Sequence, residues 1–206
     1  MHIYLGHAVG KDLDSLEMTE PVLASPTISA KEVSIAPVNT HGFRNNLIES
    51  AEIIDGTWFS TVRVAVAHDM GKRWEFGETI FRPYENNLPW IAGHASPGPL
   101  LPREFIDVGK DKLLGIMNGR EANQKIGDIT KYGKFTVGLF IYDYEKGKID
   151  WVSPKSFIQD SEAKTITFAS QFVLTGPGEG ILYAHVDDSF VRAYTTKASL
   201  IKNILP

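Results

Sequence analysis

The segment from Gly42 to Arg63 carries the side chains whose types and spacing are best suited to chemistry. A polar cluster ending at Asn46 enters an expected strand, Asp55-Gly56 turns the chain, and the return strand ends at Arg63. An arginine at the end of an apolar strand can aim a rigid fork of donors at a carboxylate or a phosphate. The alternative interpretation of Arg63 is a surface salt bridge.

A second motif runs from Ala67 to Trp74 and reads A-H-D-M-G-K-R-W, which matches an Asp-box. In such a box we expect Asp69 to cap the amides of a tight hairpin turn, Gly71 to take a positive φ, and Trp74 to pack beneath the turn. Boxes of this kind are structural and lie on the outside of sheets. We therefore exclude Asp69 from the catalytic candidates.

Metal and nucleophile chemistry have little support in the sequence. The chain has no cysteine, which removes disulfides, thiolate zinc sites and thiol catalysis. Ser50 and Ser170 lack the glycines of a nucleophile elbow. His94 and His185 are near loops that could face a site, but no histidine has an i,i+4 partner of the metal-ligand type; the six are His2, His7, His41, His68, His94 and His185. No metal or cofactor is expected.

Composition narrows the function classes further. The 206 residues are 43% apolar and 22% charged, a normal globular balance. A formal net charge of -4 offers no positive field for a nucleic acid. The N-terminal residues do not resemble a signal peptide, and the longest apolar stretch, Phe135–Tyr142, is far shorter than the roughly 20 residues of a membrane span. We expect a cytoplasmic protein with neither a nucleic-acid nor a membrane partner.

The pattern of residues predicts an all-β protein. Runs rich in β-branched and aromatic residues, separated by glycine-containing turns, predict strands. These runs are Ile3–Val9, Trp58–Ala67, Lys112–Ile116, Phe135–Tyr142, Thr165–Leu174 and Gly180–Val186. Only Lys197–Leu205 is expected to contain a helical turn, and two stretches, Ser25–Asn39 and Tyr84–Pro102, are interpreted as long loops.

A recurrent order of strand, polar turn and short closing strand favours a β-propeller of four-stranded blades over a β-sandwich, which is the alternative. Examples of the closing strand are Thr79–Phe81 and Ser156–Ile158. At about 40–50 residues a blade, residues 1–206 form one domain of about four units, the first of them incomplete. Either the N-terminal strand closes the ring, or blades are missing upstream of Met1.

The order of these features resembles glycoside hydrolase family 130, the five-bladed β-mannoside phosphorylases and mannosidases. An asparagine-led strand, a tight turn, an aromatic pair and a terminal arginine are matched by Asn46, Asp55-Gly56, Trp58-Phe59 and Arg63. The later positions of the pattern fall on Trp90, Arg103, Asn118-Gly119, Asp143, Tyr183 and Asp187. The resemblance covers most of the chain and lies in the order and spacing of its motifs.

The chain also departs from this family. The glutamate-aspartate-proline-arginine motif that carries the family's proton-donating aspartate has no match here. Arg103 falls near the family's phosphate-binding lysine, and Asn118 takes the place of its histidine without bringing a charge. These departures weigh against phosphorolysis, and against hydrolysis by this chain alone.

The resemblance implies a carbohydrate ligand in a central cleft, with inorganic phosphate as a second candidate ligand. Glycoside cleavage needs an acid near the leaving oxygen, and Glu49 and Asp187 are the catalytic candidates. The expected substrate-binding residues are Asn46, Arg63, Trp90, Arg103, Asn118, Asp143 and Tyr183. The alternatives are a non-catalytic carbohydrate-binding or scaffold propeller, and a truncated product completed by another polypeptide. A homo-oligomer is left open.

Overall fold

An eight-stranded sheet and a three-stranded sheet make up most of the computed structural model, which describes residues 3–206. We call the two antiparallel halves of the eight-stranded sheet sheets I and II, and the three-stranded sheet is sheet III. Strand accounts for 51% of the chain and helix for 6%, so the all-β prediction is confirmed. Sheet I contains β3 (Lys31–Ser34), β4 (Arg44–Ile54), β5 (Thr57–Ala67) and β6 (Glu75–Phe81). Sheet II contains β7 (His94–Leu100), β8 (Lys112–Arg120), β11 (Phe135–Asp143) and β12 (Lys148–Val152). Sheet III contains β13 (Thr167–Gly176), β14 (Glu179–Val186) and β15 (Phe190–Lys197).

The remaining elements are short. They are the hairpin strands β1 (Ala8–Val9) and β2 (Glu17–Met18), the hairpin strands β9 (Gln124–Ile126) and β10 (Ile129–Lys131), three 3-10 turns at Leu13–Ser15, Pro83–Glu85 and Pro89–Ile91, and the helix α1 (Ala198–Ile201). One parallel pairing, between Ser60 and His94, links sheets I and II. Within residues 3–206, no helix has the length and apolarity that crossing a membrane requires.

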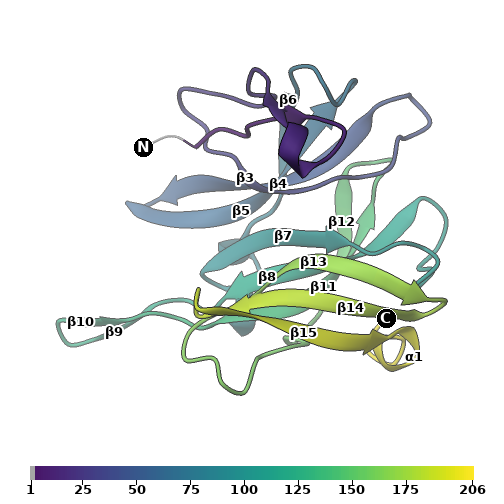
Figure 1. Ribbon diagram of the computed structural model, residues 1–206. Helices are drawn as coiled ribbons and strands as arrows, with labels where there is room; N and C mark the ends of the chain where they lie inside the picture. Colours follow the sequence, from purple (N-terminus) through teal and green to yellow (C-terminus); the bar gives the residue numbers. More distant parts are fainter. Residues whose placement is uncertain (1–2) are drawn as a thin grey trace.

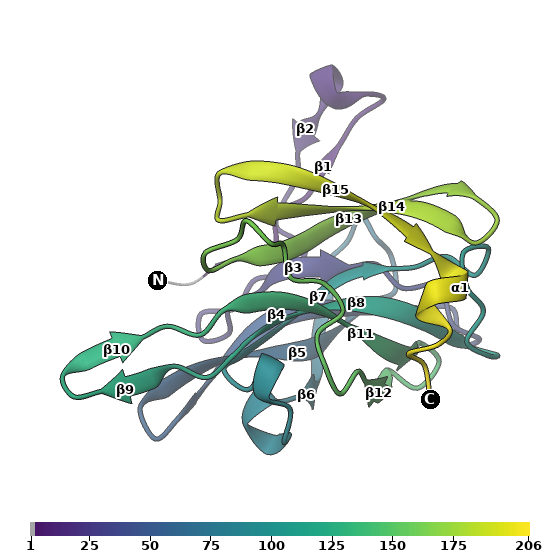
Figure 2. The ribbon, with the colours of Figure 1, turned by 90° about the horizontal axis from the view of Figure 1, so that it is seen from below.

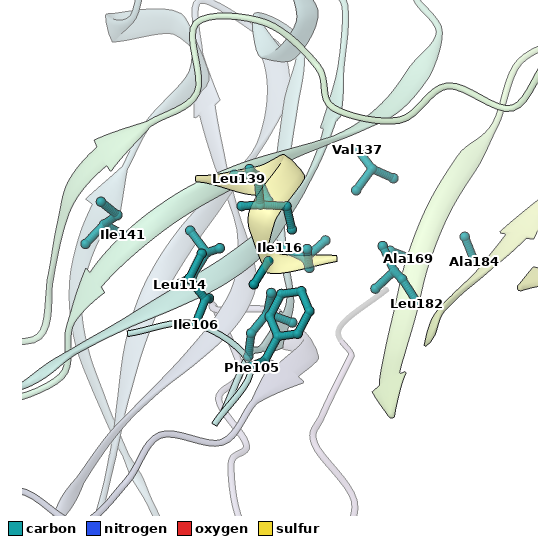
Figure 3. Packing of buried hydrophobic residues seen from close by; sticks show 13 residues of the cluster. Phe105, Ile106, Leu114, Ile116, Val137, Leu139, Ile141, Ala169, Leu182 and Ala184 are labelled. Atoms are coloured by element: carbon teal, nitrogen blue, oxygen red, sulfur yellow. The ribbon is translucent and has the colours of Figure 1, made fainter. Parts of the chain in front are cut away.

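The sheets are stacked face to face, and a hydrophobic cluster fills each interface (Figure 1). Sheets I and II enclose one cluster, which includes Leu47, Val64 and Phe140. Sheets II and III, with α1, enclose another that is built around Leu114, Leu139 and Leu182 and is shown in Figure 3. The N-terminal segment packs on the other face of sheet I through Val22 and Leu23. Sheets I and II each have a packed layer on both faces, so their strands carry apolar side chains on both faces.

The first strands of the three sheets meet around one hollow. Glu32–Ser34 of β3 with the following Ile35, Pro97–Leu100 of β7 and Ala169–Gln171 of β13 line a cavity of about 270 Å³. This convergence brings the starts of β7 and β13 to one end of the molecule, the left end in Figure 1. The β4–β5 and β9–β10 hairpins project from that same end in Figures 1 and 2. Residues 3–206 form no closed sheet.

Four of the predicted strands match the structure closely, and a short α-helix lies inside the predicted helical stretch. Two other predicted strands are shorter in the structure. Ile3–Val9 contains only β1 and an isolated bridge at Leu5, and Ser156–Ile158 forms only a bridge from Ile158 to Val137. Lys112–Ile116 continues to Arg120. The predicted first unit of the propeller starts at Met1, which lies outside the described residues.

Both stretches interpreted as loops contain a first strand, so that interpretation is wrong for β3 and β7. Pro97 and Pro99 cannot donate to a ladder, which is why the sequence of β7 resembles a loop. The strand forms because it pairs with β8, and it tolerates the prolines because Pro97–Leu100 border the hollow.

The turn predictions are largely confirmed. Asp55 and Gly56 both take positive φ, as a two-residue hairpin turn requires. In the Asp-box, the Gly71 backbone N–H donates to Asp69 Oδ1 at 2.9 Å, and Trp74 is buried. Gly71, however, does not take a positive φ. The Asp69 carboxylate holds this turn without a left-handed residue at that position.

Candidate functional site

Glu49 is a buried carboxylate at the end of the molecule where β7 begins. Its side chain is 2% exposed, with Oε1 3.0 Å from Lys31 Nζ and Oε2 3.3 Å from His94 Nε2. Burial by itself raises the pKa of Glu49, but the His94 imidazole, the Lys31 ammonium and the Ser60 hydroxyl outweigh it and lower the pKa to about 2. Glu49 therefore stays ionised at neutral pH, and its carboxylate lies against the His94 ring.

His94 forms one wall of a pocket of about 490 Å³, which we call the His94 pocket. Its lining is His94, Arg120, Asn123, Tyr132, Gly133, Phe135, Thr165 and Ile166. These residues come from β7, β8, β11, the root of the β9–β10 hairpin and the segment before β13. Backbone bonds close the walls: Gly93 N–H donates to Arg120 O at 2.8 Å, and Phe135 N–H donates to Thr165 O at 2.7 Å. The volume is in the range of small-molecule sites.

An aromatic row starts at His94 and Phe135 in the pocket wall and continues beyond the lining through Phe168 to His185. The His94 and Phe135 rings meet edge to face with centroids 4.9 Å apart. Phe168 lies 6.2 Å from Phe135 and stacks on His185 at 5.2 Å. The row therefore links sheet II to sheet III and offers an apolar surface beside the polar groups of the pocket.

Arg120 supplies the positive charge of the pocket. The half-buried guanidinium donates to Asn123 Oδ1 and, at 3.4 Å, to Gly93 O, and its Cζ lies 5.6 Å from the centre of the Phe135 ring. Burial lowers the pKa of Arg120, and the nearby Tyr132 opposes that change. Among residues 3–206, no carboxylate forms an ion pair with this guanidinium, and none lines the pocket.

Two predicted site residues hold the protein's own backbone. Asn46 is fully buried and its Oδ1 accepts the Ala36 N–H at 3.0 Å, which ties β4 to the segment after β3. Asn118 is also fully buried. It donates to Ala169 O at 2.9 Å and accepts from Ala169 N–H at 2.7 Å, which clamps β8 to β13. Both amides are therefore occupied by structural bonds.

Two predicted carboxylates cap turns. Asp143 accepts from both the backbone N–H and the Nζ of Lys146, each at 2.9 Å, and these contacts lower its pKa against the effect of burial. Asp187 accepts the backbone N–H groups of residues 164–166 at 2.8 to 2.9 Å, and these bonds lower its pKa. Because Thr165 and Ile166 line the His94 pocket, Asp187 fixes one of its walls.

Trp90 is buried against two glycines. A Cβ on Gly119 would come within 2.5 Å of the indole, and one on Gly138 would come closer still. The indole N–H donates to Ser153 O at 3.0 Å. Its faces are therefore in contact with sheet II, and we do not include it in the candidate site.

The last three predicted residues lie apart from one another. Arg63 on β5 donates through Nε to Gly77 O at 2.9 Å, and Arg103, in the exposed segment after β7, donates to Gly109 O at 2.9 Å. Tyr183 lies half-buried in the middle of β14. None of Arg63, Arg103 and Tyr183 is part of the lining of the His94 pocket.

Of the predicted set, two carboxylates contact residues of the pocket lining: Glu49 lies against His94, and Asp187 accepts hydrogen bonds from Thr165 and from the backbone N–H of Ile166. His94 was noted in the sequence only as near a loop. Lys31, Arg120 and Phe135 were missed, although Arg120 directly follows the Asn118-Gly119 pair. These three residues lie at strand ends, and that position is the only signal that the sequence gives for them. His94 was not selected as a site residue because the sequence of β7 was interpreted as a loop.

The chemistry of this arrangement is that of a binding pocket. It combines an apolar wall, a guanidinium, and an imidazole held by a carboxylate. The Glu49 and Asp187 carboxyl groups both have lowered pKa values, so neither is suited to protonate a leaving oxygen at neutral pH. No group of three or more histidine, aspartate or glutamate side chains in the described chain is arranged to hold a metal ion.

Comparison with protein families and with curated proteins finds no match. Solved structures do share the fold. One is a glycoside hydrolase described as belonging to the family of mannoside phosphorylases, family 130, that contains hydrolases targeting β-1,2 mannosidic linkages in Candida mannan; it matches with a TM-score of 0.66 and 18% identity over 96% of this chain. This chain spans 59% of that protein's length.

Two further glycoside hydrolases match less closely. A glycosyl hydrolase from Bacteroides ovatus matches with a TM-score of 0.51 and 13% identity, covering 95% of this chain and 75% of the other. A family 117 enzyme from Zobellia galactanivorans matches with a TM-score of 0.53 and 13% identity, covering 94% and 57%. The fold therefore resembles that of propeller-type glycoside hydrolases, with a likeness to family 130.

Proposed function

We propose that this chain is a carbohydrate-binding protein of the propeller type, and that it holds a mannoside or a related glycoside in the His94 pocket. In this proposal sheets I, II and III are blades around the axial hollow. The observation that carries it is the pocket itself. It lies at the end where the first strands of sheets II and III begin, and it combines an aromatic wall with an arginine and a histidine.

The pocket has the two surfaces that sugar recognition needs. Phe135 and Tyr132 offer flat apolar faces to the C–H groups of a pyranose ring. Arg120, His94 and Asn123 offer directed hydrogen bonds to hydroxyl groups. The likeness to three glycoside hydrolases favours a glycoside over other small molecules of this size. The mannoside follows from the family 130 neighbour alone.

The carboxylates favour binding without cleavage by this chain. Inverting and retaining glycosidases place two carboxyl groups about 5–10 Å apart across the scissile bond, one of them protonated. The lining of the His94 pocket contains no carboxylate, and Glu49 lies behind His94 with its pKa lowered to about 2. We therefore propose the non-catalytic carbohydrate-binding protein, which the sequence analysis gave as an alternative to an enzyme.

Calorimetric titration with β-1,2-mannobiose and with mannose tests the binding. The matched variants are Tyr132→Ala in the pocket wall and Tyr4→Ala on the N-terminal segment; both tyrosines are exposed, by 70% and 49%. We expect Tyr132→Ala to weaken binding about threefold to tenfold and Tyr4→Ala to leave it unchanged. Equal effects of the two variants, or no binding at millimolar sugar, would contradict the proposal.

A second measurement separates binding from turnover. The protein is incubated with the same disaccharide, with and without inorganic phosphate, and free mannose and mannose 1-phosphate are quantified. We expect neither product. Release of either one that is abolished by Glu49→Gln would show that the chain is an enzyme, and would overturn the assignment of Glu49 to positioning.

A further inference from the structure

Arg120 has a charge that the protein does not neutralise. Its two hydrogen bonds within the protein go to neutral oxygens, those of Asn123 and Gly93, and they leave three of its five N–H donors free. Arg82 lines another cavity, yet its guanidinium is paired with Glu52 at 2.8 Å. A half-buried guanidinium on a cavity wall without a counter-ion is suited to binding an anion from outside.

The charges around the pocket do not compete for Arg120. Glu49 lies on the far side of His94 and is paired with Lys31, whose Nζ is 3.0 Å from its Oε1. Glu121, the next residue in the chain, accepts the backbone N–H of Lys134 through Oε2 at 3.2 Å. An incoming anion would therefore meet Arg120 without displacing an ion pair of the protein.

The rest of the pocket excludes a bare inorganic ion as its best occupant. A cavity of about 490 Å³ is far larger than one oxyanion, and its wall at Phe135, Tyr132 and Ile166 gives such an ion no partner. A sugar that carries a carboxylate satisfies both parts, since its ring covers the aromatic wall while its carboxylate takes the planar fork of the guanidinium in a bidentate pair.

We propose that the preferred ligand of the His94 pocket is an acidic sugar, a glycoside with a uronate residue whose carboxylate pairs with Arg120. This proposal rests on the proposed carbohydrate-binding function and names the class of sugar. It assigns to Arg120 the selection of acidic over neutral glycosides, and to the aromatic wall the affinity that the two classes share.

Parallel calorimetric titrations test this. The probes are a mannuronate disaccharide, β-1,2-mannobiose and inorganic phosphate, at low ionic strength. The variants are Arg120→Gln, Arg120→Lys and, as a matched control, Arg73→Gln, which removes an exposed arginine of the N-terminal face whose partner is Ala24 O at 3.3 Å. Near-ultraviolet circular dichroism confirms that each variant is folded.

We expect the acidic disaccharide to bind the wild-type protein at least tenfold more tightly than mannobiose. Arg120→Gln should abolish this preference, because it weakens binding of the acidic disaccharide far more than the binding of mannobiose, which loses only a hydrogen bond to a hydroxyl group. Arg120→Lys should keep only part of the preference, and Arg73→Gln should keep all of it. This pattern supports the proposal.

The other outcomes are distinguishable. Equal binding of the acidic and neutral sugars overturns the acidic-sugar proposal and leaves carbohydrate binding standing. Phosphate binding as tight as that of the mannuronate disaccharide, and equally sensitive to Arg120→Gln, shows a site for free oxyanions and overturns it as well. Failure of both sugars to bind the folded wild-type protein overturns the carbohydrate function, and the acidic-sugar proposal with it.

Discussion

Replacing Glu49 with glutamine should change how the stability of this protein depends on pH. The folded-state pKa of Glu49, about 2, lies below its ordinary value of 4.5. A carboxylate of this kind stabilises the fold at pH values above 4.5, and the stabilisation is lost as the pH falls towards 2. At about 1.4 kcal/mol per pH unit, the difference is worth about 3 kcal/mol.

Solvent screens this interaction very little, because the Glu49 side chain is only 2% exposed. The full difference of about 3 kcal/mol is therefore expected. Removing one partner of a buried ion pair typically costs about 3–5 kcal/mol. In Glu49→Gln, Lys31 can turn to water because it is 46% exposed, whereas His94 is only 12% exposed and loses its partner. The cost should therefore lie near the lower end of that range.

The assay is urea denaturation followed by tryptophan fluorescence at pH 7, 5, 3 and 2. We expect Glu49→Gln to be about 3 kcal/mol less stable than wild type at pH 7, and the two proteins to converge by pH 2. The matched control is Glu78→Gln, a change of an exposed glutamate on β6, which should alter the unfolding free energy by less than about 0.5 kcal/mol at every pH. Parallel curves for wild type and Glu49→Gln between pH 5 and pH 2 would refute the reasoning.

Three further changes test the packing around the site. Gly138→Ala should destabilise the fold by about 1–3 kcal/mol in urea, because its Cβ would collide with the buried Trp90 ring. Trp90→Phe should cost about 1–3 kcal/mol by the same assay, since it leaves the Ser153 carbonyl without its donor; an unchanged midpoint would show that the indole N–H is dispensable. Asp187→Asn should lower the melting temperature at pH 7. Because the backbone N–H groups of residues 164–166 lower the pKa of Asp187, this difference should shrink as the pH falls below 3.8, and a constant difference would argue against an ionised cap.

Much of the fold could be predicted from sequence because its strands are long and rich in β-branched and aromatic residues. β5 and β11 stand out in this way, and so does the Asp55-Gly56 turn between β4 and β5. The first strands of sheets I and II could not be recognised, because β3 is polar and β7 carries two prolines. β7 is also buried through its middle, from Ala95 to Gly98, so it shows no alternation of apolar and polar residues that a sequence could reveal.

The candidate site was harder to predict, for a physical reason. Asn46, Asn118 and Trp90 have the residue types of ligand-binding groups, but the same polar and aromatic side chains also clamp one sheet to the next. A sequence does not show whether an amide is already occupied by a neighbouring strand. Arg120 is the opposite case, since it becomes a candidate only when the absence of a carboxylate partner among the described residues is visible.

The layered packing has a consequence for how proteins of this architecture vary in size. Each hydrophobic cluster joins only a sheet and its immediate neighbour in the chain, so no cluster depends on a sheet two layers away. Gaining or losing a terminal layer in evolution would then disturb a single interface and leave the others intact, as in modular repeat proteins. Such modularity allows one architecture to accommodate chains of very different length.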